Sequence, residues 1–143
     1  YFTKISDISD AGRDEIHRFM VRSAVSAADE LPIRAIVCNS SSGETPRLCS
    51  ALRPKLPIYT FSYRPAVVRQ LSLTYGVIPM HQKFIENIQE LQKISAEALI
   101  EQAGFAGHDK VIVLAKNIPS KEYNNLFCVS ELNDFLNQRA VPS

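Results

Sequence analysis

The sequence predicts an open α/β domain. A mostly parallel sheet of about five strands, the last of which can run antiparallel, is expected to carry helices on both faces, giving three layers. Short apolar runs rich in branched side chains alternate with segments of helical periodicity along the chain. The 143 residues, 45% hydrophobic and 22% charged, can bury one ordinary core, so we expect a single domain over residues 1–143.

The first helix is predicted to follow a lead-in segment of residues 1–9, with Ser9 or Asp10 as its N-cap, and to end at Pro32. Residues on its inward face recur at three- and four-residue steps. They are Ile16, Phe19, Met20, Ser23, Ala24, Ala27 and Leu31. Residues 33–38 then form a buried strand, because their apolar run is continuous and rich in branched side chains.

A polar loop and a second helix follow this strand. Asn39, three consecutive serines and Gly43 break the apolar run. We expect Thr45 to cap a helix over residues 46–52, with Pro46 at the first helical position, where a missing N–H costs nothing.

The middle of the chain continues the alternation. Residues 56–61 and 77–80 are predicted strands, and between them a short helix opens at Pro65. A long helix is expected over residues 83–102, ended by Gly104. Its inward stripe is predicted as Phe84, Ile88, Leu91, Ile94, Ala98 and Leu99.

The C-terminal part adds two strands and a helix. Residues 110–115, KVIVLA, are the clearest strand pattern in the chain, and residues 126–129 form the last strand. A polar loop over residues 120–125 separates them. Ser130 is expected to cap a short amphipathic helix over residues 131–138.

Composition excludes several classes of function. A net charge of +1 and a pI near 7.9 provide no electrostatic footprint for nucleic acid or an anionic membrane. No apolar run approaches the roughly 20 residues that span a bilayer, and no export signal is visible. The chain begins at Tyr1 rather than Met, so we expect it to be excised from something longer.

The cysteines and histidines indicate no metal site. Cys38, Cys49 and Cys128 are odd in number and lack CxxC spacing, which excludes a disulfide framework or zinc site and favours a reducing cytoplasm. We expect Cys38 and Cys49 to be buried as small hydrophobes. The three histidines, His17, His81 and His108, show no metal-ligand spacing and are interpreted as surface or capping residues.

The serine loop is the candidate binding site. Ligands of an open parallel sheet bind beyond the carboxyl ends of its strands, and a loop that opens a helix there favours a phosphate. The alternative is that the serines only cap and turn the chain, as short strand–helix loops often do. The loop is neither a Walker A nor a GxGxxG motif, and no recognisable catalytic or metal-binding carboxylates accompany it.

One stretch resembles a known family. The run AIVCNSSSGETPRLCSALRPKLPIYTFSYRPAVVRQLSLTYGVIP, residues 35–79, resembles the C-terminal domain of pyruvate kinase. In that family a strand, a Ser/Thr-rich loop with S-G, a helix ending in R-P, a strand, a helix and a Y-x-G-[VI]-x-P element occur in this order. The preceding helix and the later KVIVLAKNIP also match, so the resemblance covers about residues 14–129.

The resemblance implies an allosteric domain that also contributes to the tetramer interface. Substrate, Mg²⁺ and K⁺ would be held by other domains, and this chain would carry no cofactor. The effector would be fructose 1,6-bisphosphate or another sugar phosphate, with its 6-phosphate in the serine loop. Carried over by position, the phosphate-binding residues would be Ser40, Ser41, Ser42, Gly43 and Thr45.

The opposite wall of that pocket departs from the family pattern. The family has an Arg-Pro and a glycine-rich loop after the penultimate strand, whereas this chain has Ile118-Pro119 followed by Ser120. An arginine of the long-helix region is replaced near Gln92. The candidate substitutes are Lys93, Lys116 and Lys121, although a lysine cannot form a bidentate guanidinium clamp. The effector could therefore be a bisphosphate, a monophosphate, another ligand or none.

The resemblance makes this chain the regulatory and oligomerisation domain of a pyruvate kinase, inactive without its catalytic barrel. The parent enzyme would convert phosphoenolpyruvate and ADP to pyruvate and ATP, and copies would associate through the first helix or the last strand. An alternative is a stand-alone module of the same fold that binds a small phosphorylated metabolite. A third hypothesis, a small hydrolase or transferase, needs a general base near Ser42, and none is visible in the sequence.

Overall fold

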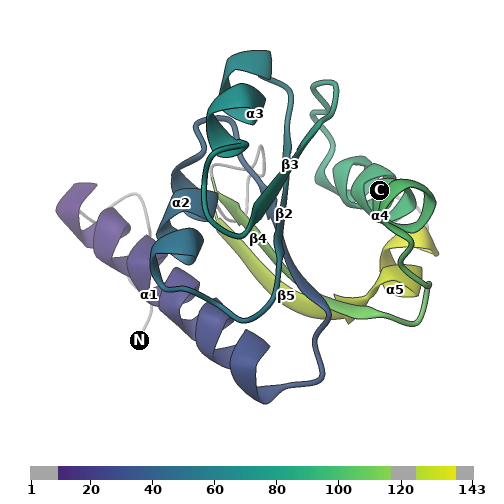
Figure 1. Ribbon diagram of the computed structural model, residues 1–143, viewed down its shortest axis with the longest axis horizontal. Coiled ribbons are helices and arrows are strands. Elements are labelled where there is room, and N and C mark those ends of the chain that lie inside the picture. Colours follow the sequence, from purple (N-terminus) through teal and green to yellow (C-terminus); the bar gives the residue numbers. More distant parts are fainter. Residues whose placement is uncertain (1–9, 117–124, 138–143) are drawn as a thin grey trace, which may run out of the picture.

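The computed structural model describes residues 10–116 and 125–137. Figure 1 shows a central sheet with helices on both faces. In chain order the elements are α1 (Asp10–Glu30), β1 (Ala35–Asn39), α2 (Glu44–Ala51), β2 (Ile58–Ser62), α3 (Pro65–Leu71), β3 (Val77–His81), α4 (Ile88–Ala103), β4 (Lys110–Lys116), β5 (Asn125–Glu131) and α5 (Leu132–Leu136).

The sheet has the order β3-β2-β1-β4-β5, with parallel pairing everywhere except between β4 and β5. This confirms the predicted fold class, including the antiparallel last strand. In register, Ile36 of β1 lies between Ile58 of β2 and Ile112 of β4. The chain builds outward from β1 to β3 and then returns to the other side of β1, so the strand order reverses between β1 and β4. Open α/β sheets bind ligands at such a reversal.

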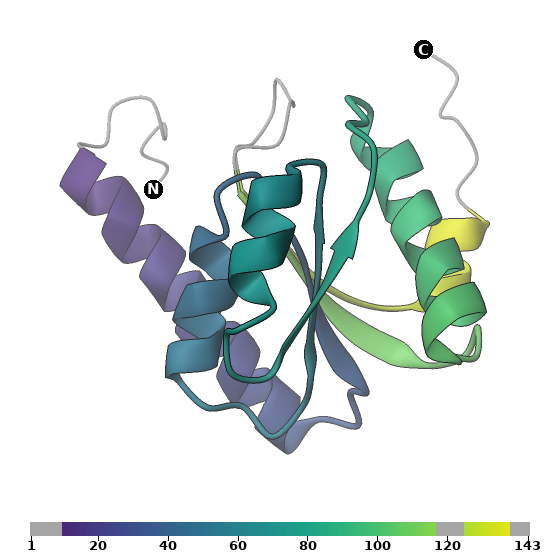
Figure 2. The ribbon, with the colours of Figure 1, turned by 45° about the horizontal axis from the view of Figure 1, so that its top comes forward.

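Both faces of the sheet are covered, as Figures 1 and 2 show. Helices α1, α2 and α3 lie on one face, where Ile36 and Cys38 join a core with α1 residues such as Val21 and Ala24. Helices α4 and α5 cover the other face, and Val37 packs there with residues of both helices. Central strands buried on both sides require apolar residues at every position, which explains the continuous apolar runs in the sequence.

The start of α2 differs from its prediction. Gly43, not Thr45, is the N-cap, and its φ of 83° lies in the left-handed region. Thr45 therefore lies inside the first helical turn. The prediction chose Thr45 because its hydroxyl can cap a helix. The chain turns two residues earlier, at Gly43, because glycine can adopt the left-handed conformation.

Helix α5 also begins one residue later than predicted. Its N-cap is Glu131 rather than Ser130, and Glu131 forms a capping box with Asp134. Leu132 and Phe135 are buried, as expected for the inner face. The predicted polar loop over residues 120–125 lies almost wholly outside the described residues.

Helix α1 buries a different face from the one predicted. Ile16, Phe19 and Leu31, expected on its inward face, are 37%, 63% and 48% exposed. The helix packs instead through smaller side chains, which are Val21, Ala24, Val25 and Ala28.

The long helix also differs from its prediction. Asn87 caps α4, and its side chain accepts a hydrogen bond from the Glu90 N–H at 3.0 Å, so residues 83–87 are not helical. The buried residues of α4 are Gln92, Ser95, Ala96 and Leu99. Phe84, predicted on the inward stripe, is 64% exposed. The prediction relied on large apolar side chains, but three of the four buried residues of α4 have small or amide side chains. Helix α3 ends at Leu71, earlier than the exit expected at Tyr75-Gly76, and the remaining strand and helix bounds differ from prediction by at most two residues.

Candidate functional site

The serine loop lies at the carboxyl end of β1, beside the strand-order reversal. The Ser40 N–H donates to the carbonyl oxygen of Phe61 in β2 at 3.1 Å, which anchors the loop to the neighbouring strand. The Ser40 hydroxyl accepts from the Gly43 N–H at 2.8 Å, and the Ser42 hydroxyl accepts from the Glu44 N–H at 3.3 Å. Two of the serines thus stabilise the turn itself, which is the structural role considered from the sequence.

The loop leaves other N–H groups available. Within the described part of the chain, the backbone N–H groups of Ser41, Ser42 and Thr45 donate to no acceptor. Ser41 and Ser42 are exposed, and the adjoining helix α2 directs the positive end of its dipole toward the loop. These donors can bind an anion at the loop.

The Thr45 hydroxyl points away from this opening. Thr45 is 2% exposed, and its Oγ1 lies 3.2 Å from Nε2 of His17 on α1. His17 is itself only 4% exposed, so its interpretation as a surface or capping histidine is wrong. A buried imidazole needs a polar partner, and Thr45 provides one. His81 and His108 are exposed, as predicted.

Two arginines that the sequence analysis missed reach the loop. Arg47, in α2, donates from Nη1 to the Ser42 carbonyl oxygen at 3.1 Å and from Nη2 to Gln70 Oε1 at 3.0 Å. Arg64, which follows β2, donates from Nη1 to the Ser41 carbonyl oxygen at 3.4 Å. The signal available in the sequence was the position of Arg64 just beyond a strand that neighbours β1. These guanidinium groups bring positive charge to the loop, where the exposed Glu44 adds one carboxylate.

The structure describes the predicted lysines only in part. Lys116 ends β4, directly after Ala115, which is paired with Asn39. Its backbone therefore reaches the same edge of the sheet as the serine loop. Lys121 lies outside the described residues. Lys93 is exposed on α4, whereas Gln92, the preceding residue of the helix, is buried.

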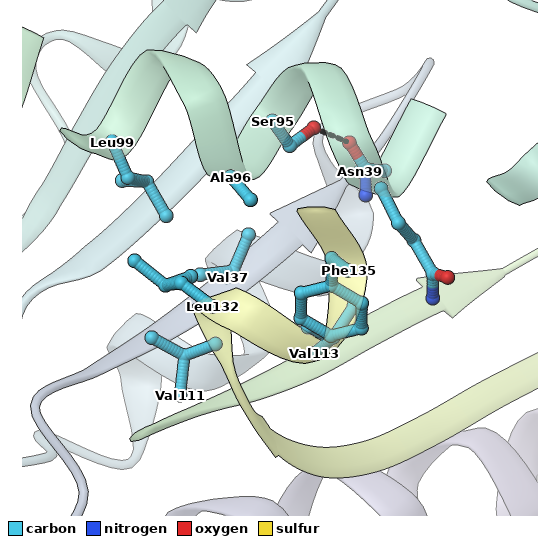
Figure 3. A pocket seen from close by; sticks show the side chains of 10 residues that line it. Val37, Asn39, Ser95, Ala96, Leu99, Val111, Val113, Leu132 and Phe135 are labelled. Atoms are coloured by element: carbon cyan, nitrogen blue, oxygen red, sulfur yellow. Dashed lines mark hydrogen bonds between the residues drawn. The ribbon is translucent and has the colours of Figure 1, made fainter. Parts of the chain in front are cut away.

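A small cavity lies between α4, α5 and strands β1 and β4 (Figure 3). Its volume of about 10 Å³ admits about one water molecule, so it cannot hold a metabolite. The Ser95 hydroxyl lies 3.4 Å from Asn39 Oδ1 and 3.2 Å from Gln82 Oε1. Within the described residues, Asn39 Nδ2 and Gln82 Nε2 are buried without a partner. The polar cluster of Ser95, Asn39 and Gln82 thus links α4 to the end of β1.

The cysteines are free, and Cys38 and Cys49 are buried as predicted. Hydrogen bonding with Cys49, together with burial, raises the pKa of the Cys38 thiol. Among residues 10–116 and 125–137, no group of three or more His, Cys, Asp or Glu side chains could hold a metal ion. No helix in the same part of the chain is long and apolar enough to cross a membrane.

The fold places this protein in the class of open α/β domains whose ligand-facing loops gather at the carboxyl edge of the sheet. Residues 19–130 match the profile of a family described as "Pyruvate kinase, alpha/beta domain". The chain therefore belongs to the pyruvate kinase α/β domain family, which confirms the resemblance seen in the sequence.

Individual relatives agree with this assignment. The chain is 29% identical to the pyruvate kinase of Geobacillus stearothermophilus over 117 residues, covering 80% of this chain and 20% of the relative. It is 32% identical to that of Schizosaccharomyces pombe over 112 residues, covering 73% and 22%. The chain thus spans about a fifth of the length of these relatives.

A solved structure shares the fold. Pyruvate kinase of Cryptosporidium parvum, in complex with ADP, matches with a TM-score of 0.73 and 22% identity. The match covers 82% of this chain and 24% of that chain.

Proposed function

We propose that this chain is the regulatory and oligomerisation domain of a pyruvate kinase, and that its serine loop binds the phosphate of a small phosphorylated effector. The parent enzyme transfers the phosphoryl group of phosphoenolpyruvate to ADP on a separate catalytic barrel, where Mg²⁺ and K⁺ are held. The observation that carries the effector site is the set of N–H groups on Ser41, Ser42 and Thr45 that have no acceptor among the described residues, with two arginines beside the loop.

The donors suit a phosphate monoester. Its dianion accepts several hydrogen bonds at once, and charge-assisted bonds are the stronger kind. Arg47 and Arg64 now donate to loop carbonyl groups, and both hydrogen bonds lie at the exposed surface, so the side chains can turn to a bound phosphate without leaving a buried carbonyl unpaired. Ser40 and Gly43 shape the turn, while Ser41 and Ser42 provide N–H and hydroxyl donors.

The rest of the effector faces β4. Lys116 and Lys121 are the weaker candidates for contacts on that side, because neither can form a bidentate clamp. A sugar monophosphate therefore fits this chain better than a bisphosphate.

Self-association is the second part of the proposal. Helix α1 exposes 37% of Ile16 and 63% of Phe19, and Leu31 near its end is 48% exposed. Strand β5 is an edge strand of the sheet, and its Val129 is 41% exposed. An apolar helix face and an open strand edge are both surfaces that a second copy can cover. The three free cysteines, Cys38, Cys49 and Cys128, support a reducing cytoplasmic location.

An NMR titration tests the effector site. Glucose 6-phosphate is added to ¹⁵N-labelled chain, with glucose and sodium sulfate as controls. We expect saturable amide shifts confined to residues 40–47 and 62–65 with the sugar phosphate, none with glucose, and weaker shifts with sulfate. If no sugar phosphate, including ribose 5-phosphate and fructose 1,6-bisphosphate, shifts these amides at about 10 mM, the effector proposal is wrong.

A coupled assay tests the catalytic assignment. The chain is mixed with phosphoenolpyruvate, ADP, Mg²⁺ and K⁺, and pyruvate is measured. We expect no turnover above the rate without protein. Pyruvate formation that grows with the concentration of the pure chain would contradict the assignment of catalysis to another domain.

A further inference from the structure

His17 occupies a position on α1 where an apolar residue would be expected. The residues of α1 that pack in the core, Val21, Ala24, Val25 and Ala28, lie on one stripe of the helix. His17 continues this stripe one turn earlier and is 4% exposed. An imidazole among core positions costs free energy unless it is hydrogen-bonded, so a contact with a polar side chain bears on its role.

One such contact is with a residue of the proposed phosphate site. The His17 Nε2 lies 3.2 Å from the Thr45 Oγ1, and 28 residues separate the two in the sequence. Thr45 is the second residue of α2, directly after the N-cap Gly43 and Glu44. Its backbone N–H, in the first turn of α2, donates to no acceptor among the described residues. The His17 contact thus acts on the turn that carries the anion donors.

Helices α1 and α2 also pack through apolar residues. The two helices pack against each other, and their core residues there are apolar, with Cys49 of α2 beside the α1 stripe. Apolar contacts are non-directional, whereas a hydrogen bond fixes both distance and orientation. The His17–Thr45 pair is therefore suited to set where the first turn of α2 stands relative to α1.

We propose that His17 is a positioning residue for the serine loop. Through the Thr45 hydroxyl it holds the first turn of α2 so that the N–H groups of Ser42 and Thr45 converge on one phosphate. This inference rests on the proposed effector site. In this role α1 helps to shape the binding site without contacting the ligand. The same helix exposes Phe19.

Four variants test the role, with inorganic phosphate as the probe and amide NMR shifts as the readout. His17→Leu removes the hydrogen bond, and His17→Gln retains a polar group at similar reach. We expect H17L to weaken phosphate binding about fivefold or more, and H17Q to stay within about twofold of the wild type, since the hydrogen bond to Thr45 is lost in the first and can be retained in the second. Val21→Ala, on the same buried stripe, controls for loosened packing: it is expected to lower Tm but to leave the dissociation constant unchanged.

The outcomes separate the two proposals. If the wild-type chain binds no phosphate, the effector site itself fails, and the role of His17 fails with it. If the wild type binds and H17L binds equally well, or V21A loses as much affinity as H17L, only the role of His17 is overturned. Should H17L not fold, Thr45→Val removes the partner hydroxyl and keeps the side-chain shape. Wild-type affinity in T45V would also overturn the proposal.

Discussion

Arg64, the N-cap residue of α3, donates a hydrogen bond from its Nη1 to the carbonyl oxygen of Ser41, 3.4 Å away in the loop that follows β1. The contact joins two loops that lie side by side because β1 and β2 are neighbours in the sheet. It also brings a guanidinium group to exposed backbone N–H groups at the opening of α2. Two loops thus contribute to one candidate anion site.

Removing either loop arginine should weaken phosphate binding. We expect Arg64→Gln and Arg47→Gln each to raise the dissociation constant for glucose 6-phosphate about fivefold, or about 1 kcal/mol, since these charges are exposed and screened. The difference should shrink as ionic strength rises. Arg69→Gln, in the last turn of α3, is the matched control and should bind like the wild type. Wild-type affinity for glucose 6-phosphate in both R64Q and R47Q would contradict a role for the arginines.

Gly43 should be needed for both stability and binding. Its φ of 83° strains any other residue, and a Cβ there would lie 3.1 Å from Arg47 Nη1. We expect Gly43→Ala to lower the free energy of unfolding by about 1–2 kcal/mol and to weaken phosphate binding. Gly76→Ala is the control, because Gly76 has a φ of 72° but no atom within 4 Å of the position that a Cβ would take. G76A should lose stability by urea denaturation yet keep the wild-type affinity.

Asp109 should make stability depend on pH in acid. The backbone N–H of Ala106 and the guanidinium of Arg34 hold the pKa of Asp109 below its ordinary value. A lowered pKa stabilises the folded chain above the unfolded pKa of about 3.9, and this contribution is lost as pH falls through the folded pKa.

The matching variant is Asp109→Ala. We expect it to cost about 1 kcal/mol at pH 7, from the lost ion pair and turn hydrogen bond, because Arg34 is 46% exposed and the pair is partly screened. Urea denaturation at several pH values measures this. The difference in the free energy of unfolding between wild type and variant should become smaller below about pH 4. A gap that stays constant down to about pH 2.5 would show that the carboxylate charge is not responsible.

The cysteines should differ in reactivity. Cys38 and Cys49 are fully buried, and burial raises the pKa of the partly exposed Cys128. Since the thiolate is the nucleophile, we expect Ellman's reagent at about pH 8 to titrate at most one thiol in the folded chain, slowly, and all three in denaturant. Cys128→Ser should abolish the reaction of the folded chain. Fast reaction of C128S would mean that the core between α2 and β1 opens readily.

Phe19 should report self-association. It is 63% exposed on α1, so Phe19→Ser should change the free energy of unfolding of a single chain by less than about 0.5 kcal/mol. If α1 forms an interface, the variant should shift the mass measured by light scattering toward one chain. Leu73→Ser is the control, since Leu73 is 93% exposed after α3. A wild type of single-chain mass at high concentration would contradict association of this chain through α1.

Local patterns in the sequence were enough to predict the alternation of strands and helices, the turn after β1 and the serine loop as the candidate site. Periodicity, prolines and glycines act on neighbouring residues, so they report local conformation directly. The continuous apolar runs also predicted a sheet covered on both faces. The buried faces of two helices were the exceptions. Ile16 and Phe19 of α1 are exposed, and the inner face of α4 includes Gln92 and Ser95, which no apolar pattern reveals.

The contacts between atoms of the candidate site depend on how the whole domain packs. The Thr45 hydroxyl faces His17 rather than the loop opening, and Arg64 arrives from the neighbouring strand. The two contacts join residues 28 and 23 positions apart. Local pattern cannot specify such pairs, because their distance depends on strand order and helix packing across the whole sheet. The serine loop could therefore be predicted from the sequence, whereas its contacts with Arg64 and with His17 could not.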